Sequence, residues 1–134
     1  MFPIRIDGYR DFFREGEQFL AAALGAHRKG KASFTPEILY NLTAMAVEKY
    51  LMAFLMSRGR LAENHTMADL LRNVEETAGP LDRELAAGLL HLDSFQEICQ
   101  LDTYRRTPPL PTEIPRILAI GEMVRLFVTP RLAC

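Results

Sequence analysis

The sequence predicts an all-α fold, an up-and-down bundle of four to five helices that forms a single domain over residues 1–134. The chain has the length of one domain, and its 49% hydrophobic content supplies enough apolar side chains for a core. Leu and Ala together number 34 against 11 for Ile and Val, which favours helices because unbranched side chains keep their rotamer freedom there. Apolar residues recur at steps of three and four, and no run alternates with period two, so a sheet is not expected.

The first helix is expected from about Asp7 to Lys29. Apolar residues such as Phe12, Phe19 and Ala23 lie on one face of a helix with 3.6 residues per turn. Gly16 falls on the same face, where its missing side chain would let a neighbouring helix approach closely. Residues 30–33 form the connector that follows.

The second helix is expected from Pro36 to Arg58, with Thr35 as its N-cap and Gly59 as a left-handed C-terminal cap. It is apolar on most of its circumference, so it is expected to be the central helix, or to be covered on a second side by another subunit. Glu48 and Lys49 interrupt the apolar residues. Neighbouring helix positions point about 100° apart, so the two cannot face one ligand, and a structural role is expected.

Capping and stop signals delimit the rest of the chain. Thr66 and Asp69 resemble a capping box and predict a short third helix that stops at residues 79–80. A fourth helix is expected from Leu81 to about Thr103 and a last one from about Thr112 to Val128.

The connectors in this scheme are short. Three prolines at positions 108, 109 and 111 exclude continuous helix between the fourth and last helices. Connectors of roughly 5 to 10 residues make neighbouring helices antiparallel.

The N-terminus lacks a basic segment followed by an apolar stretch, and no uncharged apolar run approaches the roughly 20 residues of a membrane span. A cytoplasmic protein with no membrane contact is therefore expected. Cys99 and Cys134 make neither a metal cluster nor a disulfide framework, and no Gly-rich phosphate loop is present. No cofactor and no metal site are expected.

Two features suggest contact with phosphate. His65 immediately precedes a helix N-terminus, where free amides and the helix dipole attract anions; the alternative is a surface residue at the helix entry. Arg105 and Arg106 offer bidentate donors just before a proline-rich stretch. Their alternative role is to complement the C-terminal end of a helix.

The order of these elements resembles the HEPN family of small helical domains. Members show an Ala-x-x-x-x-Glu-Lys helix, then a Gly, then a His just ahead of an Asp-Leu helix start. Here the Glu-Lys pair lies in the sequence AVEKYLMAFL at 46–55, which is followed by Gly59 and by HTMADLL at 65–71. Residues 104–108, YRRTP, are similar to the Tyr and Arg-Tyr-Pro ending of the family's fourth helix, with Thr107 in place of the tyrosine. The resemblance covers roughly residues 7 to 128.

The resemblance implies a four- or five-helix bundle that forms a homodimer and that works beside a minimal nucleotidyltransferase. Some members are metal-independent ribonucleases in which four to six residues separate an Arg from the His that follows it. Arg60 and Arg58 both satisfy this spacing to His65. However, Leu61 and Gly59 follow these arginines, where the nuclease members tend to carry a polar residue.

These observations predict a nucleotide- or RNA-interacting accessory subunit of a toxin–antitoxin-like module, with Tyr104, Arg105 and Arg106 as the nucleotide- or RNA-binding residues. One alternative is a metal-independent ribonuclease, in which His65 transfers a proton while Arg58 or Arg60 holds the phosphate. The other is a non-catalytic dimeric interaction protein. The sequence leaves open whether the chain is an enzyme, and it does not specify the nucleotide, the protein partner or the biological process.

The homodimer is also expected from the apolar surface of the second helix. This helix contains Met45, Met52 and Met56 among its apolar residues, and an interface of more than about 1,000 Å² is expected from its apolar surface.

Overall fold

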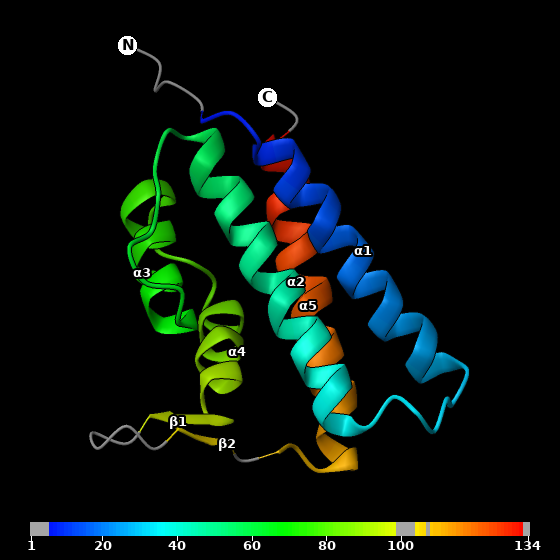
Figure 1. Ribbon diagram of the computed structural model, residues 1–134. Helices are drawn as coiled ribbons and strands as arrows, with labels where there is room; N and C mark the ends of the chain where they lie inside the picture. The colour runs from blue at the N-terminus through cyan, green and yellow to red at the C-terminus, as the bar shows by residue number, and fades with distance from the viewer. Residues whose placement is uncertain (1–5, 99–103, 107, 133–134) are drawn as a thin grey trace.

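The computed structural model describes residues 6–98, 104–106 and 108–132, in which five α-helices pack into an all-α bundle (Figure 1). This confirms the predicted fold class. The elements in chain order are α1 (Tyr9–Arg28), α2 (Pro36–Ser57), α3 (Met67–Ala78), α4 (Arg83–Asp93), β1 (Gln96–Ile98), β2 (Tyr104–Arg106), a 3-10 turn (Pro111–Glu113) and α5 (Ile114–Leu132).

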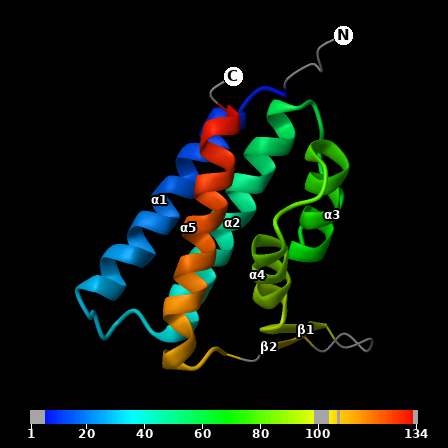
Figure 2. The ribbon, with the colours of Figure 1, turned by 180° about the vertical axis from the view of Figure 1, so that it is seen from behind.

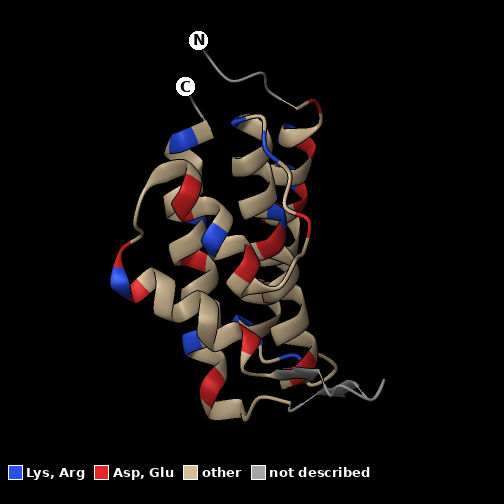
Figure 3. Ribbon diagram, turned by 90° about the vertical axis from the view of Figure 1, so that its left-hand side faces the viewer, with Lys and Arg blue, Asp and Glu red and all other residues tan. Residues whose placement is uncertain are grey.

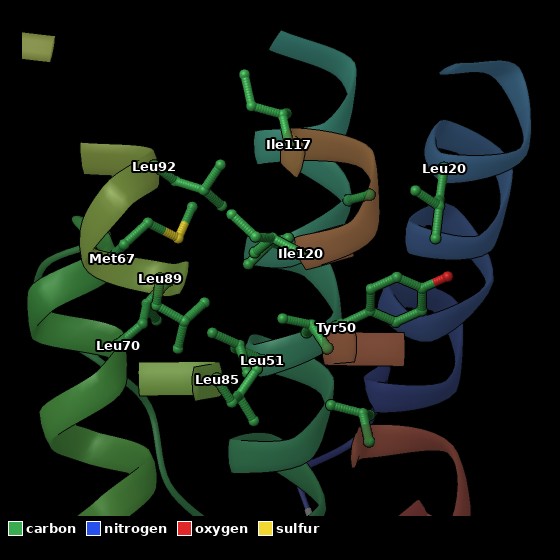
Figure 4. Packing of buried hydrophobic residues seen from close by; sticks show 14 of the residues in the cluster. Leu20, Tyr50, Leu51, Met67, Leu70, Leu85, Leu89, Leu92, Ile117 and Ile120 are labelled. Carbon is green, nitrogen blue, oxygen red and sulfur yellow. The ribbon is translucent and has the colours of Figure 1, made fainter. Parts of the chain in front are cut away.

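The bundle has two parts that meet on α2. The long helices α1, α2 and α5 pack together, with α5 crossing behind α1 and α2, and the shorter helices α3 and α4 cover the other side of α2 (Figures 1 and 2). Leu51 of α2 faces Leu85 and Leu89 of α4, whereas Tyr50 points toward α1 (Figure 4). Helix α2 is therefore the central, most buried helix, as predicted.

The apolar circumference of α2 is covered within this one chain. Met52 and Met56 are only 4% and 5% exposed, and of the three methionines used to predict a dimer only Met45, at 44%, reaches solvent. By length and composition α2 is also the one described helix that would suit a membrane span, but 61% of its most apolar stretch is buried inside the bundle, as in a core helix.

The predicted helix caps form as expected. The Ile38 amide donates to Thr35 Oγ1 at 3.3 Å, and the Asp69 amide donates to Thr66 Oγ1 at 3.1 Å. Gly59 adopts a φ of +74° after α2. The amide of Arg60 then donates to the carbonyl of Leu55 at 2.9 Å, which closes the helix end.

Gly16 allows the close approach of α1 to α2 that the sequence predicts. A Cβ atom at this position would lie 3.1 Å from the Tyr50 ring and 3.2 Å from the carbonyl oxygen of Ala46. Ordinary carbon contacts are 3.5–4.0 Å long. The absence of a side chain at Gly16 therefore sets the distance between the two helices.

One connection departs from the antiparallel arrangement. Residues 58–66 run from the end of α2 back alongside α3, so that α2 and α3 are parallel (Figure 1). Arg60, just after α2, contacts Glu76 in the last turns of α3, while Met67, at the start of α3, lies near Met45 in the first half of α2. The other successive helices are antiparallel.

The prediction that the fourth helix runs to about Thr103 is wrong, because α4 ends at Asp93. The last carbonyls of α4 find side-chain donors: Ser94 Oγ donates to His91 O at 2.6 Å and Tyr40 Oη donates to Leu92 O at 2.8 Å. A further helical turn is thus not needed to satisfy them.

A short antiparallel ribbon, β1 paired with β2, follows α4, and the periodicity of the sequence did not indicate it. The last helix also exceeds its predicted end, Val128, and continues to Leu132.

Candidate functional site

A cleft of about 300 Å³ lies between α2 and the N-terminus of α3, closed at one side by the end of α4. It brings His65, a predicted site residue, together with residues from three helices. Its described lining consists of Tyr40, Asn41, Ala44, Met45, Glu48, His65, Thr66, Met67 and Asp93.

His65 faces Glu48 across this cleft. The distance from His65 Nδ1 to Glu48 Oε1 is 3.5 Å, and the two side chains are 47% and 35% exposed. This contact is longer than an ordinary hydrogen bond, so the imidazole and the carboxylate are both able to contact a ligand, and an imidazole nitrogen can exchange a proton with it. The arrangement is therefore chemically able to bind a hydrogen-bonding group or to transfer a proton.

Sequence reasoning missed Glu48 as a site residue. The expectation that Glu48 and Lys49 diverge is correct: Lys49 Nζ contacts Glu15 of α1 at 2.9 Å and lies 4.4 Å from the centre of the Phe12 ring. The signal for Glu48 was present as helical spacing, because residues 41, 44, 45 and 48 recur at steps of three and four and share the face of α2 that lines the cleft.

The N-terminus of α3 does not offer the open anion site that the sequence suggested. The amides of Met67 and Ala68 donate to Asp93 Oδ1 and Oδ2, each at 2.9 Å. The carboxylate of Asp93 is thus the anion that these amides hold. A phosphate would have to displace Asp93 to bind there.

Arg60 lies at the other end of α3 from His65. Its Nε donates to Asn73 Oδ1 at 3.0 Å, a terminal nitrogen donates to Thr77 Oγ1 at 3.4 Å, and its guanidinium forms an ion pair with Glu76. These partners belong to the last turns of a 12-residue helix, which is about 18 Å long. Within one chain, Arg60 therefore does not join His65.

Arg58 does not join His65 either. Its Nη2 donates to the carbonyl of Arg131 at 3.3 Å, and its guanidinium carbon lies 5.2 Å from the centre of the Phe54 ring. These contacts hold Arg58 where α2 and α5 end. Neither of the two arginines predicted for a ribonuclease site lines the cleft.

Tyr104, Arg105 and Arg106 form β2, and their side chains lie outside the part that the structure describes. Their backbone pairs with β1, with Arg106 opposite Gln96. Gln96 follows Asp93 by three residues, so the backbone of Arg106 lies within roughly 15 Å of the end of α4 that closes the cleft. Figure 1 shows β2 next to the end of α4, so the predicted nucleotide-binding segment lies on the side of the cleft that the end of α4 closes.

A second polar cluster joins α1, α2 and α5 away from the cleft. Glu17 Oε1 accepts from Tyr50 Oη at 2.6 Å and from Arg125 Nε at 2.8 Å. Burial, together with this carboxylate, raises the pKa of Tyr50 far above its usual value, while the same carboxylate raises the pKa of Arg125. The cluster ties the three long helices together.

Charges on the side of α3 and α4 are mixed in sign. Among the residues coloured in Figure 3, acidic and basic positions are interspersed along the ribbon, without one large basic area. Within the described residues, no group of three or more His, Cys, Asp or Glu side chains is placed to hold a metal ion. Cys99 and Cys134 lie outside those residues.

The chain matches no protein-family model, no curated protein and no solved structure. Its similarity to HEPN proteins accordingly stays an interpretation of the sequence.

Proposed function

We propose that the chain is a HEPN-type protein that binds a nucleotide or RNA through the His65 cleft and the neighbouring β2 strand. The observation that carries the proposal is the convergence of His65, Glu48 and Asp93 in a cleft that the end of α4 closes, on the side where β2 lies. A cleft that combines hydrogen-bonding side chains with apolar walls is the usual form of a small-ligand site. The backbone of β2, which carries Arg105 and Arg106, lies within roughly 15 Å of the end of α4, so we expect the phosphates of such a ligand on that side.

Binding is favoured over RNA cleavage by the positions of the cationic side chains. Cleavage without a metal needs a cation on the scissile phosphate beside the proton-transferring group. The described lining of the cleft contains neither Lys nor Arg, and both Arg58 and Arg60 are engaged elsewhere. The chain thus fits an accessory subunit better than it fits a nuclease.

The pairing of His65 with Glu48 nevertheless favours a second candidate, the metal-independent ribonuclease. A histidine that lies beside a carboxylate is equipped for general acid–base chemistry. In a homodimer, the cation that Arg58 and Arg60 of the same chain do not supply could come from the second copy. The support for a homodimer is the order of sequence elements shared with HEPN proteins.

The biological setting that we propose is a cytoplasmic module in which the chain partners a minimal nucleotidyltransferase. Its support is the order of sequence elements shared with HEPN proteins. Co-purification with a nucleotidyltransferase encoded beside it tests this setting. A protein that purifies alone and binds no such enzyme would reduce the proposal to the cleft itself.

Binding is tested by titrating the full chain with nucleoside monophosphates and with short single-stranded RNA at low and high salt. Replacing Arg105 and Arg106 by alanine is expected to weaken binding, and to do so more at low salt, because salt already screens exposed charge contacts. Replacing His65 by alanine is expected to weaken binding at both salt concentrations. Absence of any nucleotide or RNA binding by the folded protein refutes the proposal.

The same protein decides the ribonuclease alternative. Cleavage that persists in EDTA, leaves a 2′,3′-cyclic phosphate and falls by roughly 10² or more in His65→Ala establishes catalysis. Growth arrest on expression that His65→Ala abolishes would be the cellular counterpart. Unaltered RNA after long incubation with the wild-type protein excludes a ribonuclease.

A further inference from the structure

We propose that the cleft takes the base of its ligand rather than the phosphate, and that Glu48 selects guanine. This inference rests on the nucleotide- or RNA-binding function proposed above and names the part of the ligand that the cleft recognises. It follows from the charge, the size and the free acceptors of the cleft.

The charge of the cleft excludes phosphate from its interior. Its described lining carries the carboxylates of Glu48 and Asp93 and the imidazole of His65, and neither Lys nor Arg. The amides at the start of α3, which would otherwise attract an anion, already bind Asp93 at 2.9 Å. An electroneutral group that donates hydrogen bonds suits this interior, whereas an anion is repelled.

The size of the cleft points to a single base. Its volume of about 300 Å³ is at the lower end of the range for ligand pockets. Met45, which is 44% exposed, and Ala44 supply apolar surface from α2, with Met67 of α3 opposite. The thioether of a methionine packs well against an aromatic ring. The sugar and phosphate would then extend outward, on the side where β2 lies.

The acceptors identify the base. Both oxygens of Asp93 are used by backbone amides, and the hydroxyl of Thr66 both accepts from and donates to Asp69. Glu48 has its Oε1 at 3.5 Å from His65, longer than an ordinary N–H···O hydrogen bond. Asn41 also lines the cleft, but its amide offers a single acceptor oxygen. The carboxylate of Glu48 is therefore the pair of adjacent acceptors that is open to a ligand in the described part of the cleft.

Guanine matches two parallel acceptors better than the other bases. Its Watson–Crick edge presents N1–H and the N2 amino group side by side, so that each carboxylate oxygen receives one hydrogen bond. Adenine and cytosine present one amino group next to an acceptor nitrogen, and uracil presents one N–H between two carbonyl oxygens. In each of these bases an acceptor faces a carboxylate oxygen, which disfavours binding.

The experiment compares ligands that carry the same 5′-phosphate and differ only in the base. Isothermal titration of the full chain with the 5′-monophosphates of guanosine, adenosine, cytidine and uridine is expected to show guanosine monophosphate binding about tenfold more tightly than the others. Inosine monophosphate, which lacks the N2 amino group, is expected to lose most of that preference. Guanosine without a phosphate is expected to bind with an affinity that is nearly independent of salt.

A matched pair of variants assigns the preference to one side chain. Glu48→Gln replaces one acceptor oxygen by a donor and is expected to remove the guanine preference, with less than twofold change for the other bases. Glu63→Gln is the control, because Glu63 is exposed in the loop before α3 and does not line the cleft. It is expected to bind like the wild-type protein.

The outcomes separate this inference from the proposed function. Nucleotide binding without a guanine preference, a preference that inosine monophosphate retains in full, or a preference that survives in Glu48→Gln overturns the inference and leaves the proposed function standing. Failure of all nucleotides and of RNA to bind overturns both. Because inosine monophosphate changes the ligand alone, the test does not depend on the folding of any variant.

Discussion

Replacing Gly16 by alanine is expected to destabilise the protein, whereas the same replacement at Gly25 is expected to stabilise it. Both glycines lie in α1. A Cβ at Gly16 would lie 3.1 Å from the Tyr50 ring and 3.2 Å from the carbonyl of Ala46, while a Cβ at Gly25 would meet no atom within 4 Å. The pair therefore compares one chemical change with and without a neighbouring helix in contact.

The magnitudes follow from two opposing effects. Alanine favours a helix over glycine by about 1 kcal/mol, and this gain applies at both positions. At Gly16 neither contact yields easily, because Ala46 O is backbone and Tyr50 is held by its 2.6 Å hydrogen bond to Glu17. Overpacking of this kind costs about 2–3 kcal/mol. The net expectation is a loss of about 1–2 kcal/mol at Gly16 and a gain of about 0.5–1 kcal/mol at Gly25.

The assay is urea unfolding followed by circular dichroism at 222 nm, with thermal melts as a second measurement. For a domain of this size, the expected loss at Gly16 corresponds to a decrease in Tm of about 4–7 °C. A Gly16→Ala protein as stable as Gly25→Ala would refute the reasoning, since it would mean that α1 and α2 are not in close contact at this point.

Three further predictions concern titration and capping. Asp93→Ala is expected to lower the free energy of unfolding by about 1–2 kcal/mol, because two amides of α3 lose their acceptor, and a change below about 0.5 kcal/mol in urea unfolding would contradict the capping role. Burial lowers the pKa of His91 in the folded protein. As the pH falls, the histidine is therefore protonated in the unfolded chain before it is protonated in the folded one. The stability that neutral His91 provides is complete above about pH 6.5 and is lost as the pH falls below that value. His91→Gln is therefore expected to flatten the pH dependence of stability between pH 7 and 5, and an identical pH profile would argue against it. The pKa of Tyr50 is raised far above that of a free phenol, so Tyr50 is expected to stay protonated up to about pH 11. Tyr50→Phe should therefore leave the rise in absorbance near 295 nm unchanged over this pH range. A smaller rise in the variant than in the wild-type protein would show that Tyr50 ionises.

The sequence was sufficient to predict the helices because their signals are local. Thr35 and Thr66 cap the helices that they precede, and Gly59 ends α2 with the left-handed backbone expected of it. The largely apolar surface of α2 predicted its central position. The same surface was also a basis for expecting a homodimer. Within one chain α1, α3, α4 and α5 cover most of it, so the homodimer stays a prediction.

The site could be predicted only in part because its contacts are not local. His65 was identified from its place before a helix. Its neighbour Glu48 lies 17 positions earlier, and Asp93 meets the start of α3 from 26 positions beyond Met67. The end of α4 is another example, since Tyr40, which bonds the carbonyl of Leu92, lies 52 positions away. Spacing along a chain does not show which distant side chain will satisfy a helix end.

The parallel arrangement of α2 and α3 places the cleft between the three long helices and the α3–α4 pair. Glu48 belongs to one of the three long helices, whereas His65 lies just before α3 and Asp93 ends α4. The two hydrogen bonds from the amides of Met67 and Ala68 to Asp93 join α3 to α4. Units of this kind detach from a folded protein at different free energies. Any molecule that fills the cleft touches both units. Its binding would therefore raise the free energy needed to separate the α3–α4 pair from the three long helices, and raise it more at higher ligand concentration.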